Sequence, residues 1–436
     1  MKKILINLLL VLALVAGLAA WIALPLAGVL VVAVLLALWL LLTRRGRQAI
    51  AVTKVGIASL PQRWGASSVI VIGIAGVVGV LVAMLAMGEG FKNTLNRTGS
   101  EDSAIILRGG SQTEVNSVIT RSQVPLIRTL AGIAQGDDGQ PLMSPELSQV
   151  VDLKTVADGT DANVTLRGVG GEVWKLRPQV RVVEGRRFQS GLREMVVGRG
   201  AQAQFRHIAV GETVELGNQT WTVVGAFDSG DSFESELWAD AEVVASSYNR
   251  GGSFQSVTVK LQDGDGLEQL KAAMAGDPRL KLDVQTTQAY YAGQSRQLTT
   301  MINILGTVIG SIMAIGAVFG ALNTMYSAVA TRAREIATLR ALGFRGLPVV
   351  LAVMLETLLL ALLGGLLGAA LAWLFFNGYS VSTLGMNFTQ VVFQFQVSPV
   401  LLWTGLKWAL GIGLVGGLFP ALRAARLPVA TALRSA

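Results

Sequence analysis

The chain has 436 residues, of which 52% are hydrophobic and only 15% are charged, and its formal net charge is +8. Soluble proteins carry about 25% charged residues, so this composition excludes both a disordered chain and an ordinary soluble protein. A basic balance would suggest nucleic acid in a soluble protein, but this apolar excess points first to a membrane, where basic residues gather on cytoplasmic loops. No nucleic-acid partner is expected.

Cysteine is absent and there is one histidine, His207. The missing cysteines exclude disulfides, thiolate metal sites and cysteine nucleophiles. The neighbours of His207 in the sequence include no second metal ligand, so a structural or surface role is expected for it. We expect this chain to hold no metal and no cofactor.

The first apolar stretch, residues 4–43, carries no charged side chain. One straight helix of that length would measure about 60 Å, twice the hydrocarbon core of a bilayer. Pro25, with Gly28 close by, offers a break, so we predict a transmembrane hairpin over 1–43, with helices at 4–23 and 26–43. The alternative is a signal peptide, whose apolar region normally ends after about 7–15 residues.

Residues 44–66 contain five basic residues and no acid, which predicts an amphipathic segment on the cytoplasmic surface, broken near Pro61. A transmembrane helix is predicted over 67–92, followed by an extracytoplasmic domain over 93–297 that has no spanning stretch. The remainder, 298–436, contains three more apolar spans, which lie at 302–329, 347–376 and 400–422. The first of these exceeds the hydrocarbon core in length, so it is expected to continue a helix that begins near Gln288.

The distribution of charge gives the orientation of these six helices. The predicted cytoplasmic segments hold 14 of the 36 basic residues and only one of the 28 acids, Glu335; these segments are 1–3, 44–66, 327–345 and 423–436. The rest of the chain keeps 22 basic and 27 acidic residues. By the positive-inside rule both termini are cytoplasmic and the large domain lies on the other side of the membrane.

The domain over 93–297 mixes short strands with helices. Strands are predicted at 104–108, 164–167 and 195–197, a helix at 118–133, and a hairpin at 212–224 with Gly217-Asn218 at its turn. A strand, a helix and a strand follow at 256–261, 267–274 and 280–284. The predicted fold is therefore an α-helical polytopic membrane protein with a large α+β extracytoplasmic domain, a βαβ-type subdomain into which a β-rich subdomain is inserted at about 145–245.

A short helix is predicted over 330–343, between two membrane helices on the cytoplasmic side. Ile336, Leu339 and Leu342 recur at helical spacing and Gly343 is suited to end the helix. It could be a solvated connector or a docking helix for a cytoplasmic partner. No phosphate-binding loop of the form G-x-x-x-x-G-K-[ST] is present, so ATP binding by this chain is not expected.

The sequence R-x-R-E-I-A-x-L-R-A-L-G over 332–343, with Glu356 and Gly364-Gly365-x-x-Gly368 in the next helix, resembles the permease domain of MacB/FtsX-type (type VII, mechanotransmission) ABC transporters. Residues 420–434 resemble the end of that domain, and 68–91 resemble the helix before the family's extracytoplasmic domain. The resemblance covers roughly 50–436. The hairpin at 1–43 departs from the family's pattern of four membrane helices.

The resemblance implies a permease subunit, not an enzyme, in a bacterial inner membrane with its large domain in the periplasm. It implies a homodimer or a pair with a related permease, and ATPase subunits below that bind ATP and Mg²⁺. In MacB the ATPase is fused to the N-terminus, so here a separate ABC ATPase chain is expected; a periplasmic adaptor is compatible with the resemblance. The residues that it implies for ATPase coupling are Arg332, Arg334, Glu335, Ile336, Leu339 and Arg340.

Polar residues within the predicted spans are functional candidates because charge is costly in a bilayer. Glu356 lies about 15 Å into its helix, and a proton relay would need further carboxylates or histidines that the other spans lack. Packing against an asparagine, Asn323 or Asn303, or a place near the coupling helix, is expected instead. Lys407 is expected to extend its amine to the interface. Paired glycines permit close helix packing, namely Gly316/Gly320, Gly364/Gly368 and Gly413/Gly417.

These observations predict a subunit that couples ATP hydrolysis by a separate ATPase to movement of its periplasmic domain, for export or extraction of a periplasmic or membrane substrate. One alternative is a transmembrane regulator of a cell-wall hydrolase, as some relatives are. The other is an ATP-independent secondary transporter, which would need paired ionisable groups near the midplane.

Overall fold

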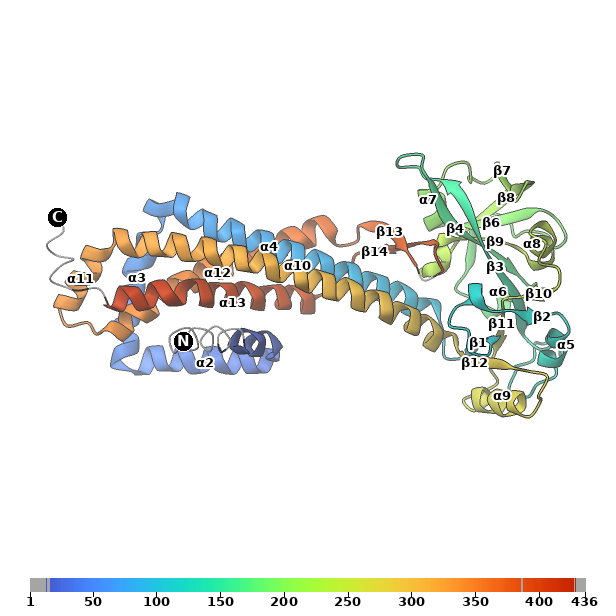
Figure 1. Cartoon of the computed structure of the whole chain (residues 1–436), viewed down its shortest axis with the longest axis horizontal. Coiled ribbons are helices and arrows are strands. Elements are labelled where there is room, and N and C mark those ends of the chain that lie inside the picture. The colour runs from blue at the N-terminus through green and yellow to red at the C-terminus, as the bar shows by residue number, and fades with distance from the viewer. Residues whose placement is uncertain (1–12, 14–15, 386, 427, 429–436) are drawn as a thin grey trace, which may run out of the picture. The chain divides into compact units, whose positions relative to one another are not determined.

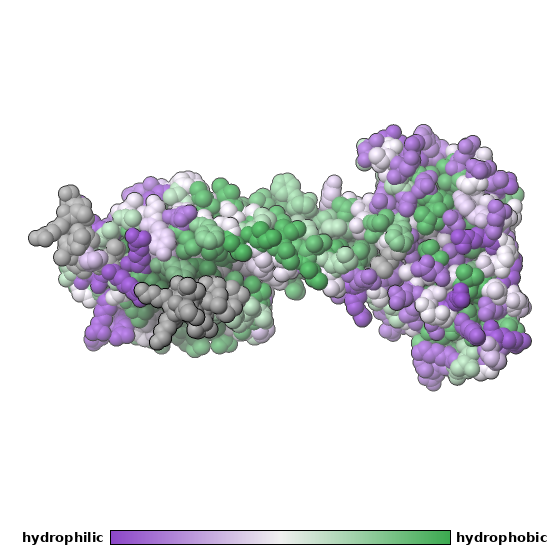
Figure 2. Space-filling model, in the orientation of Figure 1, coloured by the Kyte–Doolittle hydropathy of each residue, from purple (hydrophilic) through white to green (hydrophobic). Residues whose placement is uncertain are grey.

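The structure is a computed structural model that describes residues 13, 16–385, 387–426 and 428. The chain divides into two compact units. The first, here called the helical unit, comprises Met1–Met87, Ile302–Asn377 and Gln396–Ala436; the second, the sheet unit, comprises Gly88–Met301 and Gly378–Phe395. The surface of the helical unit is largely apolar and that of the sheet unit largely polar (Figure 2).

The helices are long where the sequence is apolar (Figure 1). By length and composition, four helical stretches within the described residues can cross a membrane, and a fifth candidate is the bent pair Ala16–Ala23 and Leu26–Leu42. The bounds of the labelled helices are α2 Leu26–Leu42, α3 Arg44–Ala58, η1 Pro61–Arg63, α4 Trp64–Thr98, α10 Thr287–Thr331, α11 Ala333–Ala341, α12 Gly346–Phe376 and α13 Pro399–Arg426. Helices α4 and α10 are both longer than the spans predicted for them, 67–92 and 302–329. Each helix contains a unit boundary, so each contributes residues to both units.

The start of the predicted hairpin, residues 1–12 and 14–15, lies outside the described residues. The described part contains the predicted break, because the chain bends by 111° between Ala16–Ala23 and α2.

Lys407 of α13 lies elsewhere than the sequence analysis expected. Its amine does not extend to the interface but is buried, and donates to the carbonyls of Ile22 and Leu24 at 2.5 and 3.2 Å. Carbonyls exposed by the helix break supply these acceptors.

Small residues set the helix packing of the helical unit. A Cβ added at Gly368 of α12 would lie 2.4 Å from the carbonyl oxygen of Ala75 in α4, and one at Gly413 of α13 would lie 2.5 Å from the Ala361 side chain. A Cβ at Gly364 or Gly417 would lie 2.8 Å from an atom of α4 or α12, respectively. The glycines therefore let these backbones approach closely. In contrast, Gly316 and Gly320 of α10 have no described atom within 4 Å of such a Cβ.

One half of the sheet unit is the predicted βαβ-type subdomain. Its strands and helices are β1 Ser103–Arg108, α5 Gln123–Arg128, β3 Met143–Lys154, β11 Ser256–Lys260, α9 Gly266–Ala275 and β12 Leu282–Thr286. The strand order is β12-β1-β11-β3, with every neighbouring pair antiparallel, so two β-α-β units interleave as in a ferredoxin-like fold. Both helices contribute to the same core cluster, through Ile127, Leu270 and Met274.

The helix predicted over 118–133 is an overestimate, because the structure has only α5 there. Residues Ile119–Thr120 form β2, which pairs with β10, Ser253–Phe254. These two residues are extended because they pair with a strand more than 130 residues away, so the first turn of the predicted helix does not form. Apolar spacing alone could not distinguish these outcomes.

The β-rich insertion is present and continues the same sheet through β3. Its elements are β4 Asp161–Val169, α6 Val173–Leu176, β5 Arg181–Gly185, β6 Glu194–Gly198, α7 Arg199–Gln204, β7 Thr213–Leu216, β8 Gln219–Asp228, η3 Ser232–Ser235, β9 Glu236–Asp240 and α8 Ala241–Ser247. The predicted hairpin is confirmed, since Gly217 and Asn218 both have positive φ, as a type I′ turn requires.

A second hairpin belongs to the sheet unit although the sequence analysis assigned it to 298–436. It consists of β13, Ser380–Leu384, and β14, Gln390–Gln394. The Thr165 and Thr389 hydroxyls lie 3.0 Å apart, and the Val392 amide donates to Ser235 Oγ at 2.8 Å. These side-chain contacts to β4 and η3 attach the hairpin, and neither leaves a local signal in the sequence.

Candidate functional site

The coupling segment predicted over 330–343 folds as a separate short helix, α11. A left-handed glycine ends it, because Gly343 has φ +96° and the Phe344 amide donates back to the Leu339 carbonyl at 3.1 Å. At its other end, α11 is separated from α10 by a single residue, Arg332. The predicted helix stop is therefore confirmed.

The candidate coupling residues divide between two faces of α11. Arg334 and Glu335 are exposed, Leu339 and Arg340 are half-buried, and Leu342 beyond them is 74% exposed. The other two candidates face inward, because Ile336 is buried and the Arg332 side chain is 11% exposed. The inward pair anchors the helix, and a partner can reach only the others.

Arg332 joins a buried ionic group that we call the Glu356 cluster, made of Glu356, Arg332 and Arg63. The Glu356 carboxylate, on α12, accepts from Arg332 at 3.0 Å and from Arg63 at 3.2 Å, and only 3% of Glu356 is exposed. Arg332 also contacts Glu335 at 3.0 Å. The cluster thus links the start of α11, the middle of α12 and η1.

The asparagines expected beside Glu356 are not its partners. Asn323 is exposed, and neither Asn323 nor Asn303 contacts the carboxylate. The other expectation, a place near the coupling helix, is correct. Gly56 on α3 makes this geometry possible, since a Cβ there would lie 2.9 Å from Glu356 Oε2.

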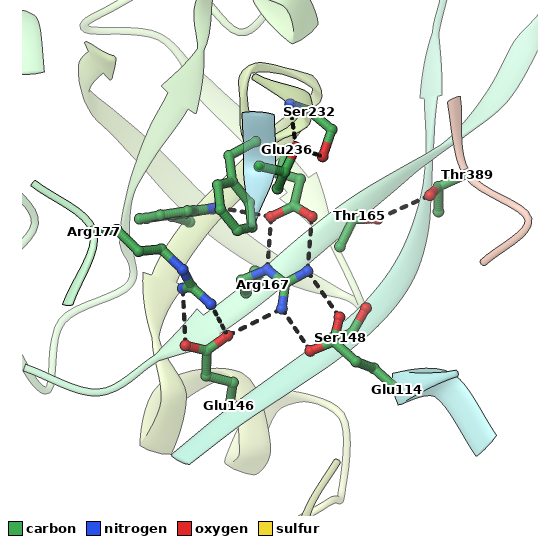
Figure 3. Close-up of polar contacts among 12 residues, drawn as sticks. Glu114, Glu146, Ser148, Thr165, Arg167, Arg177, Ser232, Glu236 and Thr389 are labelled. Carbon is green, nitrogen blue, oxygen red and sulfur yellow. Dashed lines mark hydrogen bonds and ion pairs between the residues drawn. The ribbon is translucent and has the colours of Figure 1, made fainter. Parts of the chain in front are cut away.

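The sheet unit holds a larger buried ionic group that the sequence analysis missed (Figure 3). This Arg167 cluster comprises Arg167, Arg177, Glu114, Glu146 and Glu236, and the Arg167 side chain is 2% exposed. Arg167 contacts three carboxylates, with distances of 2.9 Å to Glu114, 3.0 Å to Glu146 and 2.7 Å to Glu236. Arg177 pairs with Glu146 at 2.8 Å.

The electrostatics of the Arg167 cluster are those of a saturated network. Burial acts most strongly and raises the pKa of Glu114, but Arg167, the Ser256 hydroxyl and Arg177 together outweigh it, so the pKa of Glu114 lies below its usual value. Every charged group of this cluster has a partner of opposite charge. These ion pairs join β3, β4, β9 and η2 in the interior of the sheet unit.

The Arg167 cluster also contacts the first turn of α10. The Glu114 amide donates to Tyr290 Oη at 3.1 Å. Tyr291 packs edge-on against Phe233, with ring centroids 5.9 Å apart, and Arg177 stacks over Phe233 at 4.5 Å from its centroid. The start of α10 is thereby fixed to the sheet through both tyrosines.

Two family models match successive parts of the chain. Residues 67–276 match the MacB-like periplasmic core domain, and residues 307–429 match the FtsX-like permease C-terminal domain. The second match contains α11 and Glu356. The chain therefore carries the two domains of a MacB/FtsX-type permease.

Curated relatives of this permease are similar at low identity. The macrolide export ATP-binding/permease protein MacB of Hyphomonas neptunium is 26% identical over 410 residues, covering 88% of this chain and 60% of that protein. The pyoverdine export ATP-binding/permease protein PvdT of Pseudomonas fluorescens is 25% identical, with 84% and 56% covered. MacB of Photorhabdus laumondii is 25% identical, and the match covers 67% of this chain and 46% of that protein. The permease thus spans about half the length of these relatives.

Solved structures similar to the permease are domains of the same kind. The periplasmic region of MacB from Actinobacillus actinomycetemcomitans is 16% identical, covers 44% of this chain and 92% of that one, and has a TM-score of 0.33. The extracellular domain of the noncanonic ABC-type transporter YknZ from Gram-positive bacteria is 16% identical, covers 42% and 98%, and has a TM-score of 0.31. The family models, not these scores, carry the assignment. The permease is a multi-pass membrane protein with a periplasmic domain.

The remaining expectation for a single residue concerns His207. It is exposed, in a left-handed turn at φ +60°, and the described part of the permease contains no group of three or more side chains suited to hold a metal ion.

The Arg167 cluster had one weak signal in the sequence, an arginine within the apolar strand 164–169. Its carboxylate partners lie 21 to 69 residues away along the chain, which no local pattern reveals.

Proposed function

We propose that this permease is the membrane subunit of an ABC transporter in a bacterial inner membrane, and that ATP and Mg²⁺ bind to a separate ATPase chain. The observation that supports this most directly is α11, a short helix with an exposed face of Arg334, Glu335 and Leu342, placed by the charge distribution on the cytoplasmic side. Its inward face is tied to α12 through the Glu356 cluster. Force applied to α11 therefore reaches α12 through an ionic contact.

The connectivity supports movement of the periplasmic domain as the output. Helix α10 runs without a break from Thr287 to Thr331, and its first turn is fixed to the sheet by Tyr290 and Tyr291. Its last residue is next to Arg332 of the Glu356 cluster. A shift of α11 would be passed along α10 to the sheet unit.

Export or extraction of a substrate is the output that we favour. Two of the relatives are named as macrolide and pyoverdine export proteins, which supports export without identifying the substrate of this permease. A homodimer, or a pair with a related permease, and a periplasmic adaptor complete the proposed assembly. An ATP-independent transporter is disfavoured because Glu356 is held by two arginines. Regulation of a cell-wall hydrolase predicts a different partner, an amidase or peptidase, when residues 93–297 are crosslinked in cells.

Charge reversal on α11 tests the docking of the ATPase. The double variant Arg334→Glu/Arg340→Glu should lower co-purification of the ATPase by at least tenfold, because it would place like charges against an acidic partner surface, and like charges at an interface cost several kcal/mol. The measurement is recovery of the ATPase with the tagged full-length permease. Arg128→Glu, at an exposed arginine of the sheet unit, is the matched control and should leave recovery unchanged. Full recovery with the double variant would contradict this assignment.

A further inference from the structure

A cavity of about 300 Å³ lies beside the Glu356 cluster, within the helical unit. Its wall is formed by η1 and the first turns of α4, by the last turns of α10 and by α12. Four polar side chains line it, namely Arg63, Ser67, Ser327 and Glu356. Its volume is at the lower end of the range of small-ligand pockets, about 300–1,000 Å³.

The two arginines beside this cavity are not equally supplied with acids. Glu356 lines the cavity and is shared by Arg63 and Arg332, and Arg332 has a second carboxylate, Glu335, at 3.0 Å. Arg63 therefore has no carboxylate of its own. A guanidinium that is only 18% exposed and shares its one carboxylate would be stabilised by a further anion.

Donors remain for such an anion. Arg63 uses only Nη2 in its contacts, with Ser59 Oγ at 2.7 Å and Glu356 at 3.2 Å, so Nε and Nη1 have no hydrogen-bond partner among the described residues. The hydroxyls of Ser67 and Ser327 likewise make no hydrogen bond to any residue that the structure describes. A guanidinium edge and two hydroxyls from different helices form the donor set that a phosphate group requires.

The surroundings indicate that this phosphate belongs to a lipid. Trp64, next to Arg63, is 74% exposed, as expected for an aromatic residue at a membrane interface. One turn further along α4, Val69 and Ile72 are 56% and 64% exposed, which places acyl-chain solvent beside the cavity. The whole stretch from 44 to 66 contains no acid that would repel an anion.

We infer that this cavity binds the headgroup of an anionic phospholipid from the cytoplasmic leaflet, with its phosphate on Arg63 and near Ser67 and Ser327. Basic pockets between membrane helices on that side are suited to such headgroups. The bound phosphate would give Arg63 an anionic partner that it does not share with Arg332. This inference concerns the permease alone and stands whether or not an ATPase docks on α11.

The test uses the full-length permease in nanodiscs of phosphatidylcholine containing phosphatidylglycerol, with retained lipid counted by native mass spectrometry. The wild-type chain should retain phosphatidylglycerol in preference to phosphatidylcholine. Arg63→Gln should reduce that retention about tenfold, the loss expected for one charge-assisted hydrogen bond. Ser67→Val keeps every ion pair of the cluster while removing a cavity hydroxyl, so it should lower retention without unfolding the chain.

Arg44→Gln is the matched control, because Arg44 is an exposed arginine on α3 that does not line the cavity. An equal loss with Arg44→Gln would overturn the inference, since it would assign binding to the general basic surface. Equal retention of the two lipids by the wild-type chain would overturn it as well. Displacement of the lipid by soluble glycerol phosphate at similar concentration would overturn the assignment to a lipid and favour a free phosphate ester.

Discussion

Glu356 is the residue whose surroundings differ most from what its position in the chain suggests. It lies ten residues into an apolar helix, yet both of its partners come from segments at the ends of other helices, Arg63 of η1 and Arg332 before α11. Three formal charges are buried together, and the cost of removing them from water is offset only while the geometry is complete. The cluster is therefore most sensitive to loss of a single member.

Replacement of Glu356 by alanine should destabilise the helical unit by about 3–5 kcal/mol, since it leaves Arg63 without a carboxylate and Arg332 with only the exposed Glu335. Thermal unfolding of the full chain in detergent measures this. The double variant Glu356→Leu/Arg332→Leu should recover part of the loss by replacing the pair with apolar contact. Asn323→Ala, at an exposed position in α10, should change stability by no more than about 0.5 kcal/mol. Unaltered unfolding of Glu356→Ala would show that the cluster contributes nothing to stability.

At the scale of elements, three glycine pairs with the same spacing have two different roles. Gly364 and Gly368 bring α12 against the backbone of α4, and Gly413 and Gly417 bring α13 against α12. Gly316 and Gly320 make no comparable contact within the described residues. The spacing alone shows which faces permit close packing, and the structure shows which of them are used within one chain.

The substitutions Gly368→Ala and Gly316→Ala should therefore act in opposite directions. A Cβ at Gly368 would clash with the Ala75 carbonyl oxygen at 2.4 Å, so α4 and α12 must separate and stability should fall by about 1–3 kcal/mol. At Gly316 the space is open, and alanine should be neutral or stabilise α10 by up to about 1 kcal/mol, because glycine is a poor helix former. Thermal unfolding of both variants compares them directly. Equal stability of the two would refute the close contact.

For the whole molecule, charge and hydropathy agree on one arrangement. The apolar surface belongs to the helical unit, and the polar surface to the sheet unit (Figure 2). The segments predicted to be cytoplasmic hold 14 basic residues and one acid, while the rest of the chain has 22 basic and 27 acidic residues. The net charge of +8 is thus an orientation signal over a mildly acidic remainder.

This orientation can be measured with single cysteines, since the natural chain has none. A membrane-impermeant maleimide should label Arg128→Cys in cells whose outer membrane is permeable, because that exposed position is periplasmic. Arg334→Cys, which is exposed on α11, should react only after the inner membrane is opened. Labelling of both positions at the same rate in intact cells would contradict the arrangement.

The sequence by itself determined the long apolar helices, the break near Pro25, the orientation, the helix stop at Gly343 and the hairpin turn at Gly217-Asn218. The helices, the break, the stop and the turn depend on residues that are adjacent or a few positions apart, so local physics is sufficient for them. The orientation depends on the summed charge of the connecting segments, which the sequence also gives without any tertiary contact. Only the tertiary structure decided the partners of Glu356 and Lys407, the Arg167 cluster, the pairing of β2 with β10, and the place of β13–β14. These contacts join residues tens to hundreds of positions apart, and packing alone brings such residues within the few ångströms over which ion pairs and hydrogen bonds act.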